Sequence, residues 1–173
     1  MNELSNRLID LVALSKSYCE VCRDSYQYSK TEFTDRMLDL LPRIYWNFFD
    51  ITSVVALGEN DFFGDYVDEA IYDEIKNGIS SVMGVSDTFL ETFEEDMKYS
   101  ETPITATISE SLADIYQPLF NFVSVVHDSE GSQLEEAFIS CKEDFENYWS
   151  QTLCNVLRAL NNVKYSFGEE EEI

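Results

Sequence analysis

The sequence has 173 residues, which is enough for one domain with a substantial core and few for two. Its 34 acidic side chains outnumber 11 basic ones and give a net charge of −23, which opposes binding to nucleic-acid phosphates and anionic lipid. Apolar residues make up 45% of the chain and aromatic residues 14%, too rich a content for a disordered acidic protein. Composition therefore disfavours nucleic-acid and membrane partners and favours a folded domain.

The first residues, MNELSNRLIDL, mix charged side chains into the opening turns and lack the apolar run of a signal peptide. The longest nearly apolar run, 119–126, is far below the roughly 20 residues of a membrane-spanning helix. We therefore expect a cytoplasmic protein. Its four cysteines should then be thiols rather than a disulfide framework.

The N-terminal part of the chain repeats apolar residues every three or four positions, which predicts a first helix over 2–28. Ser29 and Glu32 have the spacing of a capping box, so a second helix should begin there. Pro42 falls inside the apolar run of that helix, which therefore either ends before the proline and restarts with it, or bends. Residues 50–64 fit a short strand, a helix or a loop. We prefer helix or loop, because an isolated strand would have no pairing partner.

A third helix is expected over 65–82, with Gly84 where a C-cap glycine belongs. A shorter helix should run from 86 to about 97, since its aromatic and leucine side chains fall on one side. The polar, proline-containing segment 98–107 is typical of a loop.

The stretch 108–127 should be the element around which the chain packs, because it has the clearest helical apolar face. Pro118 interrupts the stretch without changing the phase of that face, which predicts a kink rather than two helices. Ser132 and Glu135 again have capping-box spacing. The helix that they open can continue over 132–163, about 30 residues or roughly 45 Å.

These elements predict an all-α fold, a bundle-like array of about six or seven helices in a single domain over residues 1–165. The acidic segment 166–173 should form a solvated and disordered tail.

Residues that often carry chemistry are few. Cys19 and Cys22 have the spacing of a metal or redox pair, but they fall within a predicted helix and lack the second pair or the strand that such sites need. Cys141 and Cys154 would stand about 20 Å apart on one helix, so we expect structural thiols. The single histidine, His127, lies at a helix end. No phosphate-loop, zinc-protease or serine-hydrolase motif occurs, so the sequence indicates no catalytic residue and no cofactor.

Three acidic residues could together form a metal site. Asp65, Glu69 and Asp73 are spaced by four and would share a helix face, where oxygen ligands could hold magnesium or calcium. A solvated acidic face explains the same spacing in a chain with so many carboxylates. A divalent-metal-binding protein or enzyme is therefore an alternative rather than the favoured function.

Three segments, LLPRIY (40–45), LADIY (112–116) and LRAL (157–160), together with the region of Trp149, resemble a bacterial family known only as a domain of unknown function, of the 5063 type. In order and spacing the resemblance covers most of the chain. It implies a helical fold and a bacterial cytoplasmic setting, and it implies no activity.

Within the matched segments, Asp114 and Arg158 lie opposite the apolar sides of their helices. We hypothesise that the two polar faces meet across a cleft, where Asp114, Tyr116 and Arg158 form an ion-paired binding site. The alternative is that both faces lie toward solvent or that the pair is structural, since ion pairs are common without function.

The favoured function is a non-catalytic, acidic interaction or adaptor domain with a basic protein partner. Such a partner would be attracted by the field of the chain and held by exposed aromatic side chains. An acidic mimic of nucleic acid is a further possibility. The sequence indicates no oligomeric state. The candidate aromatic residues are Tyr45, Trp46, Phe48, Phe49, Tyr148 and Trp149.

Overall fold

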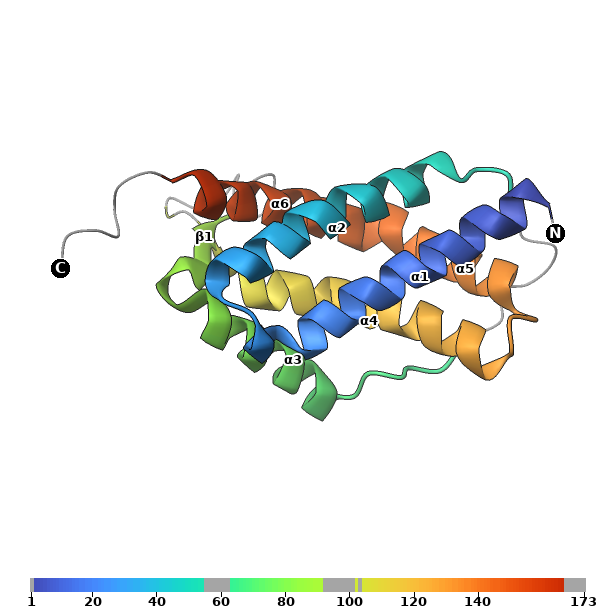
Figure 1. The fold of residues 1–173 in the computed structure, drawn as a ribbon, viewed down its shortest axis with the longest axis horizontal. Helices are drawn as coiled ribbons and strands as arrows, with labels where there is room; N and C mark the ends of the chain where they lie inside the picture. The colour runs from blue at the N-terminus through green and yellow to red at the C-terminus, as the bar shows by residue number, and fades with distance from the viewer. Residues whose placement is uncertain (1, 55–62, 92–101, 103, 167–173) are drawn as a thin grey trace.

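The computed structural model describes residues 2–54, 63–91, 102 and 104–166. In this part of the chain, helices dominate and one two-stranded sheet is present, which confirms the predicted all-α class (Figure 1). The described helices α1–α6 agree with the expected six or seven. The elements are α1 (Glu3–Arg23), α2 (Lys30–Asp50), α3 (Glu69–Met83), β1 (Thr88–Leu90), β2 (Thr105–Thr107), α4 (Ile108–Asp128), α5 (Leu134–Asp144) and α6 (Ser150–Tyr165).

The predicted capping box at the start of α2 is formed. The Ser29 hydroxyl accepts the Glu32 backbone N–H at 3.2 Å, and the Glu32 carboxylate accepts the Ser29 backbone N–H at 2.9 Å. α2 then continues unbroken through Pro42, so the alternative in which the helix ends at the proline is wrong. α2 packs against α1 and α6.

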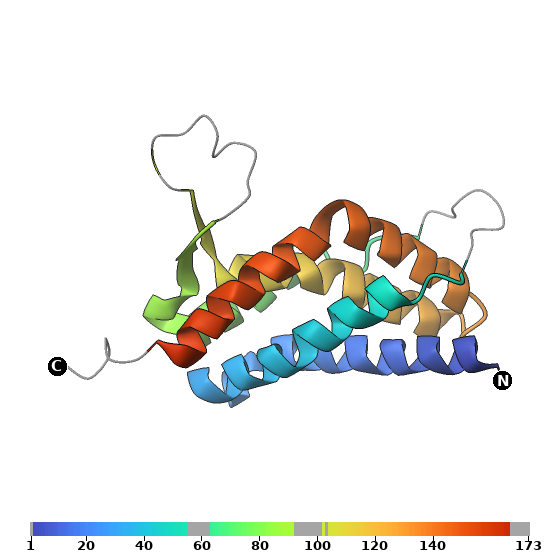
Figure 2. The same cartoon turned by 90° about the horizontal axis from the view of Figure 1, so that it is seen from above.

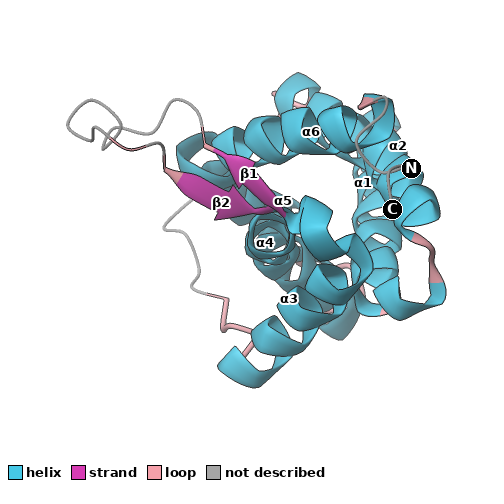
Figure 3. Ribbon diagram, turned by 90° about the vertical axis from the view of Figure 1, so that its left-hand side faces the viewer, coloured by secondary structure: helices cyan, strands magenta, loops and turns pink. Residues whose placement is uncertain are grey.

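α4 lies in the middle of the bundle and packs against α1, α3, α5 and α6, as expected for the element with the most regular apolar face (Figure 3). Pro118 lies inside this single helix. The Tyr18 hydroxyl of α1 donates a hydrogen bond to the Leu112 carbonyl at 2.7 Å, and this contact is buried. The hydrogen bond therefore joins the first helix to the central one.

Aromatic rings from different helices meet in the core at Phe48, which is fully buried. Its ring contacts four other rings, with centroid distances from 5.0 to 6.2 Å. Because these rings belong to α4, α5 and the segment after α5, the cluster links α2 to both. The partners of Phe48 are Phe122, Phe138, Phe145 and Trp149.

The helix predicted over 86–97 is wrong in its described part. Residues Gly84–Asp87 form a 3₁₀ turn, and β1 follows directly. β1 pairs antiparallel with β2, Thr88 opposite Thr107 and Leu90 opposite Thr105, so the predicted loop over 98–107 is also wrong at its end. β-branched threonines favour the extended pairing. The two strands lean away from the bundle (Figure 2), and residues 92–101 lie outside the described part.

The last helix also differs from the prediction. The capping box at Ser132 does not form, and α5 begins at Leu134 without a side-chain cap. The helical path continues to Tyr165 through a π-helical turn at Phe145–Trp149, and α5 and α6 meet there at an angle (Figure 2). A π turn inserts an extra residue into the helical repeat, so the two halves do not form the single uninterrupted α-helix that we expected.

α3 is shorter than predicted because Asp68 caps it. The Asp68 carboxylate accepts the Ile71 backbone N–H at 2.8 Å, and the helix begins at Glu69 rather than at Asp65. It ends at Gly84, as expected, and the positive φ of 55° at this residue is a conformation that favours glycine. The ambiguous segment 50–64 lies partly outside the described residues, and so does most of the acidic tail, 167–173. In the described ranges no helix is long and apolar enough to cross a bilayer.

Candidate functional site: an acidic cavity at Pro118

A cavity of about 310 Å³ opens between α4, α5 and the segment that precedes α3. We call it the Pro118 cavity. Its walls combine apolar side chains with carboxylates that come from distant parts of the chain. The apolar side chains include Phe63, Pro118 and Phe122, and the carboxylates are Asp65, Glu143 and Asp144.

Two departures from regular helix meet at the Pro118 cavity. On one wall Pro118 has no backbone N–H, so the helical hydrogen bond to the Asp114 carbonyl is absent. On the other wall Asp144 is the last residue of α5 before the π-helical turn. The Cys141 thiol donates to the Pro118 carbonyl at 3.6 Å and so connects the two walls.

Asp65 is positioned by the segment before α3. The Tyr66 backbone N–H donates to the Asn121 side chain of α4 at 2.9 Å, and the Tyr66 hydroxyl donates to Asp128 at 2.9 Å. The Asn121 amide in turn donates to Asp65 at 3.5 Å. These contacts hold the chain against α4 and direct the Asp65 carboxylate toward the cavity that it lines.

The carboxylates of the Pro118 cavity repel one another. Partial burial raises the pKa of Asp144, and the charges of Glu143 and Asp65 raise it further. Among the described residues, neither Asp65 nor Asp144 forms an ion pair with a basic side chain. The cavity therefore favours a cation, because a positive group would relieve this repulsion.

Charge is unevenly distributed along the chain. The first 50 residues hold six of the 11 basic side chains and eight of the 34 acidic ones, a net charge of −2. The remaining residues carry a net charge of −21. α1 and α2 are thus nearly neutral, and the Pro118 cavity belongs to the strongly acidic part.

The three residues predicted to share a polar cleft have separate partners. The Asp114 carboxylate accepts the Tyr72 hydroxyl of α3 at 2.8 Å, while partial burial raises its pKa. Arg158 donates to the Leu90 carbonyl of β1 at 2.5 Å. The Tyr116 ring is buried and stacks on Phe120, with centroids 5.2 Å apart. Asp114 and Arg158, both in the described part of the chain, share no ion pair, so we do not find the expected three-residue cluster.

The three carboxylates of the metal hypothesis also separate. Asp65 precedes α3 and lines the Pro118 cavity, whereas Glu69 lies in the first turn of α3. Asp73 pairs with Lys76 at 3.5 Å. The expected shared helix face is wrong because α3 begins at Glu69. Within the described residues, no three His, Cys, Asp or Glu side chains are arranged to hold a metal ion.

The thiols and the histidine have structural surroundings. Cys19, Cys22 and Cys141 are buried, and burial raises the pKa of each thiol, that of Cys22 to about 12. Such thiols are poor nucleophiles at neutral pH. Cys154 is exposed. The His127 side chain is 84% exposed, and its Nδ1 lies 3.3 Å from the Asp128 carboxylate.

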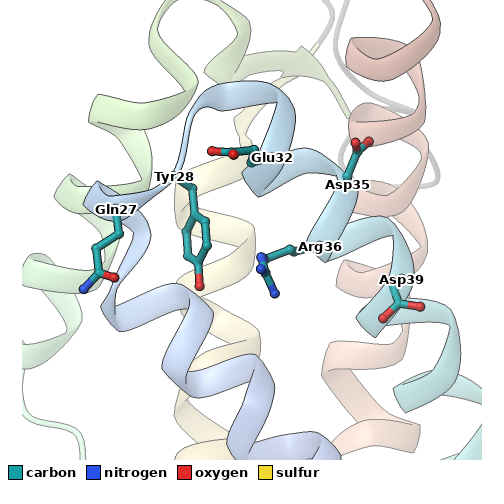
Figure 4. A pocket seen from close by; sticks show the side chains of 6 residues that line it. All are labelled: Gln27, Tyr28, Glu32, Asp35, Arg36 and Asp39. Carbon is teal, nitrogen blue, oxygen red and sulfur yellow. The ribbon is translucent and has the colours of Figure 1, made fainter.

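A wider cavity of about 460 Å³ lies at the start of α2 (Figure 4). The Arg36 guanidinium lies over the Tyr28 ring, 4.9 Å from its centroid. Asp35 pairs with Lys164 of α6 at 2.6 Å, and Asp39 pairs with Arg43 at 3.1 Å. Two of its acidic side chains, Asp35 and Asp39, thus already have basic partners, unlike Asp65 and Asp144 of the Pro118 cavity.

Fold and site together define a helical-bundle protein with an acidic surface cavity. The chain belongs to the family described as Domain of unknown function (DUF5063), whose model matches residues 2–166. It is similar to the crystal structure of protein BF1032 from Bacteroides fragilis, with a TM-score of 0.81, 27% sequence identity, and coverage of 95% of this chain and 96% of that chain. No curated protein matches the chain. The similar structure thus supports the fold, and family membership assigns no activity.

Proposed function

We propose that this domain is a non-catalytic interaction or adaptor domain that binds a basic protein in the bacterial cytoplasm. We further propose that a lysine or arginine side chain of the partner enters the Pro118 cavity. The observation that carries the proposal is the composition of this cavity, which combines apolar side chains with three carboxylates. Lysine and arginine side chains have the matching composition, an apolar stem and a cationic head.

The repulsion among Asp65, Glu143 and Asp144 supports the proposal energetically. The raised pKa of Asp144 means that its charged form is disfavoured in the free protein. A bound cation would relieve that cost, so the loss of repulsion among the carboxylates would contribute to the affinity for the cation. The charge of −21 after residue 50 would also speed the encounter with a basic partner at low salt.

Binding of a fluorescently labelled, lysine-rich synthetic peptide tests the proposal by anisotropy titration. The cavity variant Asp65→Asn/Asp144→Asn should weaken binding at least about tenfold, since hydrogen bonds to charged groups contribute about 1.5–3 kcal/mol each. The matched control Asp10→Asn/Asp39→Asn removes two charges from α1 and α2 and should change the affinity less than about threefold. Equal losses for both variants would refute a specific site.

Two further measurements separate the alternatives. Elemental analysis of protein purified without added metal should find no stoichiometric divalent metal ion, magnesium and calcium included, and finding one would favour the metal alternative. If a captured basic partner is displaced from this protein by DNA, the nucleic-acid mimic is favoured instead.

A further inference from the structure

An exposed aromatic pair lies on α2, away from the Pro118 cavity. Trp46 and Phe49 are each 58% exposed, and their ring centroids are 5.9 Å apart. Beside them a cavity of about 310 Å³ lies between α1 and α2, with Leu14 and Pro42 among its apolar lining. We call this surface, Leu14, Pro42, Trp46 and Phe49 with the cavity between the helices, the Trp46 face.

Basic side chains around the Trp46 face are paired with carboxylates, and Asp10 adds one further carboxylate to the cavity lining. Arg7 of α1 pairs with Asp50 of α2 at 2.5 Å, and Arg43 pairs with Asp39 at 3.1 Å. These pairs belong to the first 50 residues, whose net charge is only −2. The rest of the chain, at −21, would repel a second copy. Two copies, each at −23, therefore meet the least repulsion when they approach through α1 and α2.

The shape of the Trp46 face suits association about a two-fold axis. Such an interface uses the same patch on both copies, so the patch must carry both a projecting group and a hollow that receives it. Here exposed aromatic rings lie directly beside a hollow that Trp46 itself lines. Exposed aromatic side chains are also the residues that contribute most to binding in protein interfaces.

We infer that this chain forms a two-fold symmetric dimer in which Trp46 and Phe49 of one copy contact the α1–α2 cavity of the other. α1 and α2 each have 21 residues and are about 30 Å long, so both helices extend beyond the Trp46 face and offer further contacts around it. None of the residues that line the Pro118 cavity belongs to α1 or α2. The dimer would therefore leave both cavities free for the basic partner.

Sedimentation equilibrium on the full chain, from micromolar to millimolar concentration, tests the inference. Dimerisation should strengthen when salt is raised from about 0.05 to 0.5 M, because salt screens the repulsion between two acidic chains. Binding of a basic peptide should weaken over the same range, so failure of one proposal is distinguishable from failure of the other. A chain that stays monomeric at millimolar concentration and high salt would overturn the inference.

Substitutions of exposed aromatic residues test whether the Trp46 face is the dimer interface. Trp46→Ala and Phe49→Ala should each weaken dimerisation at least about 30-fold, as expected when a central aromatic residue that contributes about 2 kcal/mol is truncated. Tyr26→Ala also removes an exposed ring, 74% exposed, from the nearly neutral part of the chain and should leave dimerisation unchanged. Equal effects of Trp46→Ala and Tyr26→Ala would overturn the inference, and unchanged far-ultraviolet circular dichroism would show that each variant folds.

Tryptophan fluorescence supplies an independent readout. Trp149 is only 3% exposed, so Trp46 should account for concentration-dependent changes in emission. Dimerisation should shift the emission to shorter wavelength as protein concentration rises. If the emission is independent of protein concentration but shifts when a leucine-rich amphipathic helical peptide is added, a different partner occupies the Trp46 face and the inference is wrong.

Discussion

Replacing two adjacent phenylalanines of α2 tests the packing of the bundle. Phe48 is fully buried and contacts four rings, whereas Phe49 is 58% exposed. Phe48→Ala should cost about 3–5 kcal/mol, because a buried ring is lost and a cavity remains. That is a large part of the roughly 5–15 kcal/mol by which a domain is stable. Phe49→Ala should cost less than about 1 kcal/mol.

Urea denaturation followed by circular dichroism measures both changes in the free energy of unfolding. With a slope of about 2 kcal/mol per molar urea, Phe48→Ala should lower the midpoint by about 1.5–2.5 M and Phe49→Ala by less than about 0.5 M. Neighbouring residues on a helix differ by about 100° in direction. Similar midpoints for the two variants would therefore show that the register of α2 beyond Pro42 differs from the one described.

Three further predictions concern single groups. Asp144→Asn should stabilise the fold at neutral pH, because the raised pKa of Asp144 means that its charge disfavours folding. Thermal melts at several pH values should show that the gain in stability over the wild type vanishes as the pH falls below that pKa, where Asp144 itself is neutral. Tyr18→Phe should lower the unfolding free energy by about 1 kcal/mol in urea titrations, since the buried Leu112 carbonyl loses its hydroxyl donor. Mass spectrometry after treatment with a thiol reagent should show one fast label, at Cys154, and equal labelling rates for all four thiols would contradict the burial of the other three, Cys19, Cys22 and Cys141.

Long amphipathic segments could be predicted from the sequence because their signal repeats over many turns. The apolar face of α4 and the capping box of Ser29 and Glu32 are both present as expected. β1 and β2 could not be predicted in this way, since strands of three residues are too short to show a recognisable alternating pattern. Nor does a local pattern distinguish the π-helical turn at 145–149 from regular helix.

The Pro118 cavity could be predicted only in part. Pro118 signalled a kink, and Asp65 was singled out, although for a helix face that does not form. Asp144 gave no signal, because its proximity to Asp65 results from the packing of α5 beside α4. Net charge alone likewise does not locate Asp65 and Asp144, because their positions at one cavity depend on three-dimensional structure.

Amide chemical shifts in a nitrogen-15 NMR titration test the central claim most directly. With a lysine-rich peptide as the probe, we predict that the largest shifts occur at the amides around the Pro118 cavity, those of Asn121, Ser140 and Asp144. They should be lost in the Asp65→Asn/Asp144→Asn variant. Shifts centred on α1 and α2, or spread evenly over the acidic surface, would contradict a cation-binding cavity at Pro118.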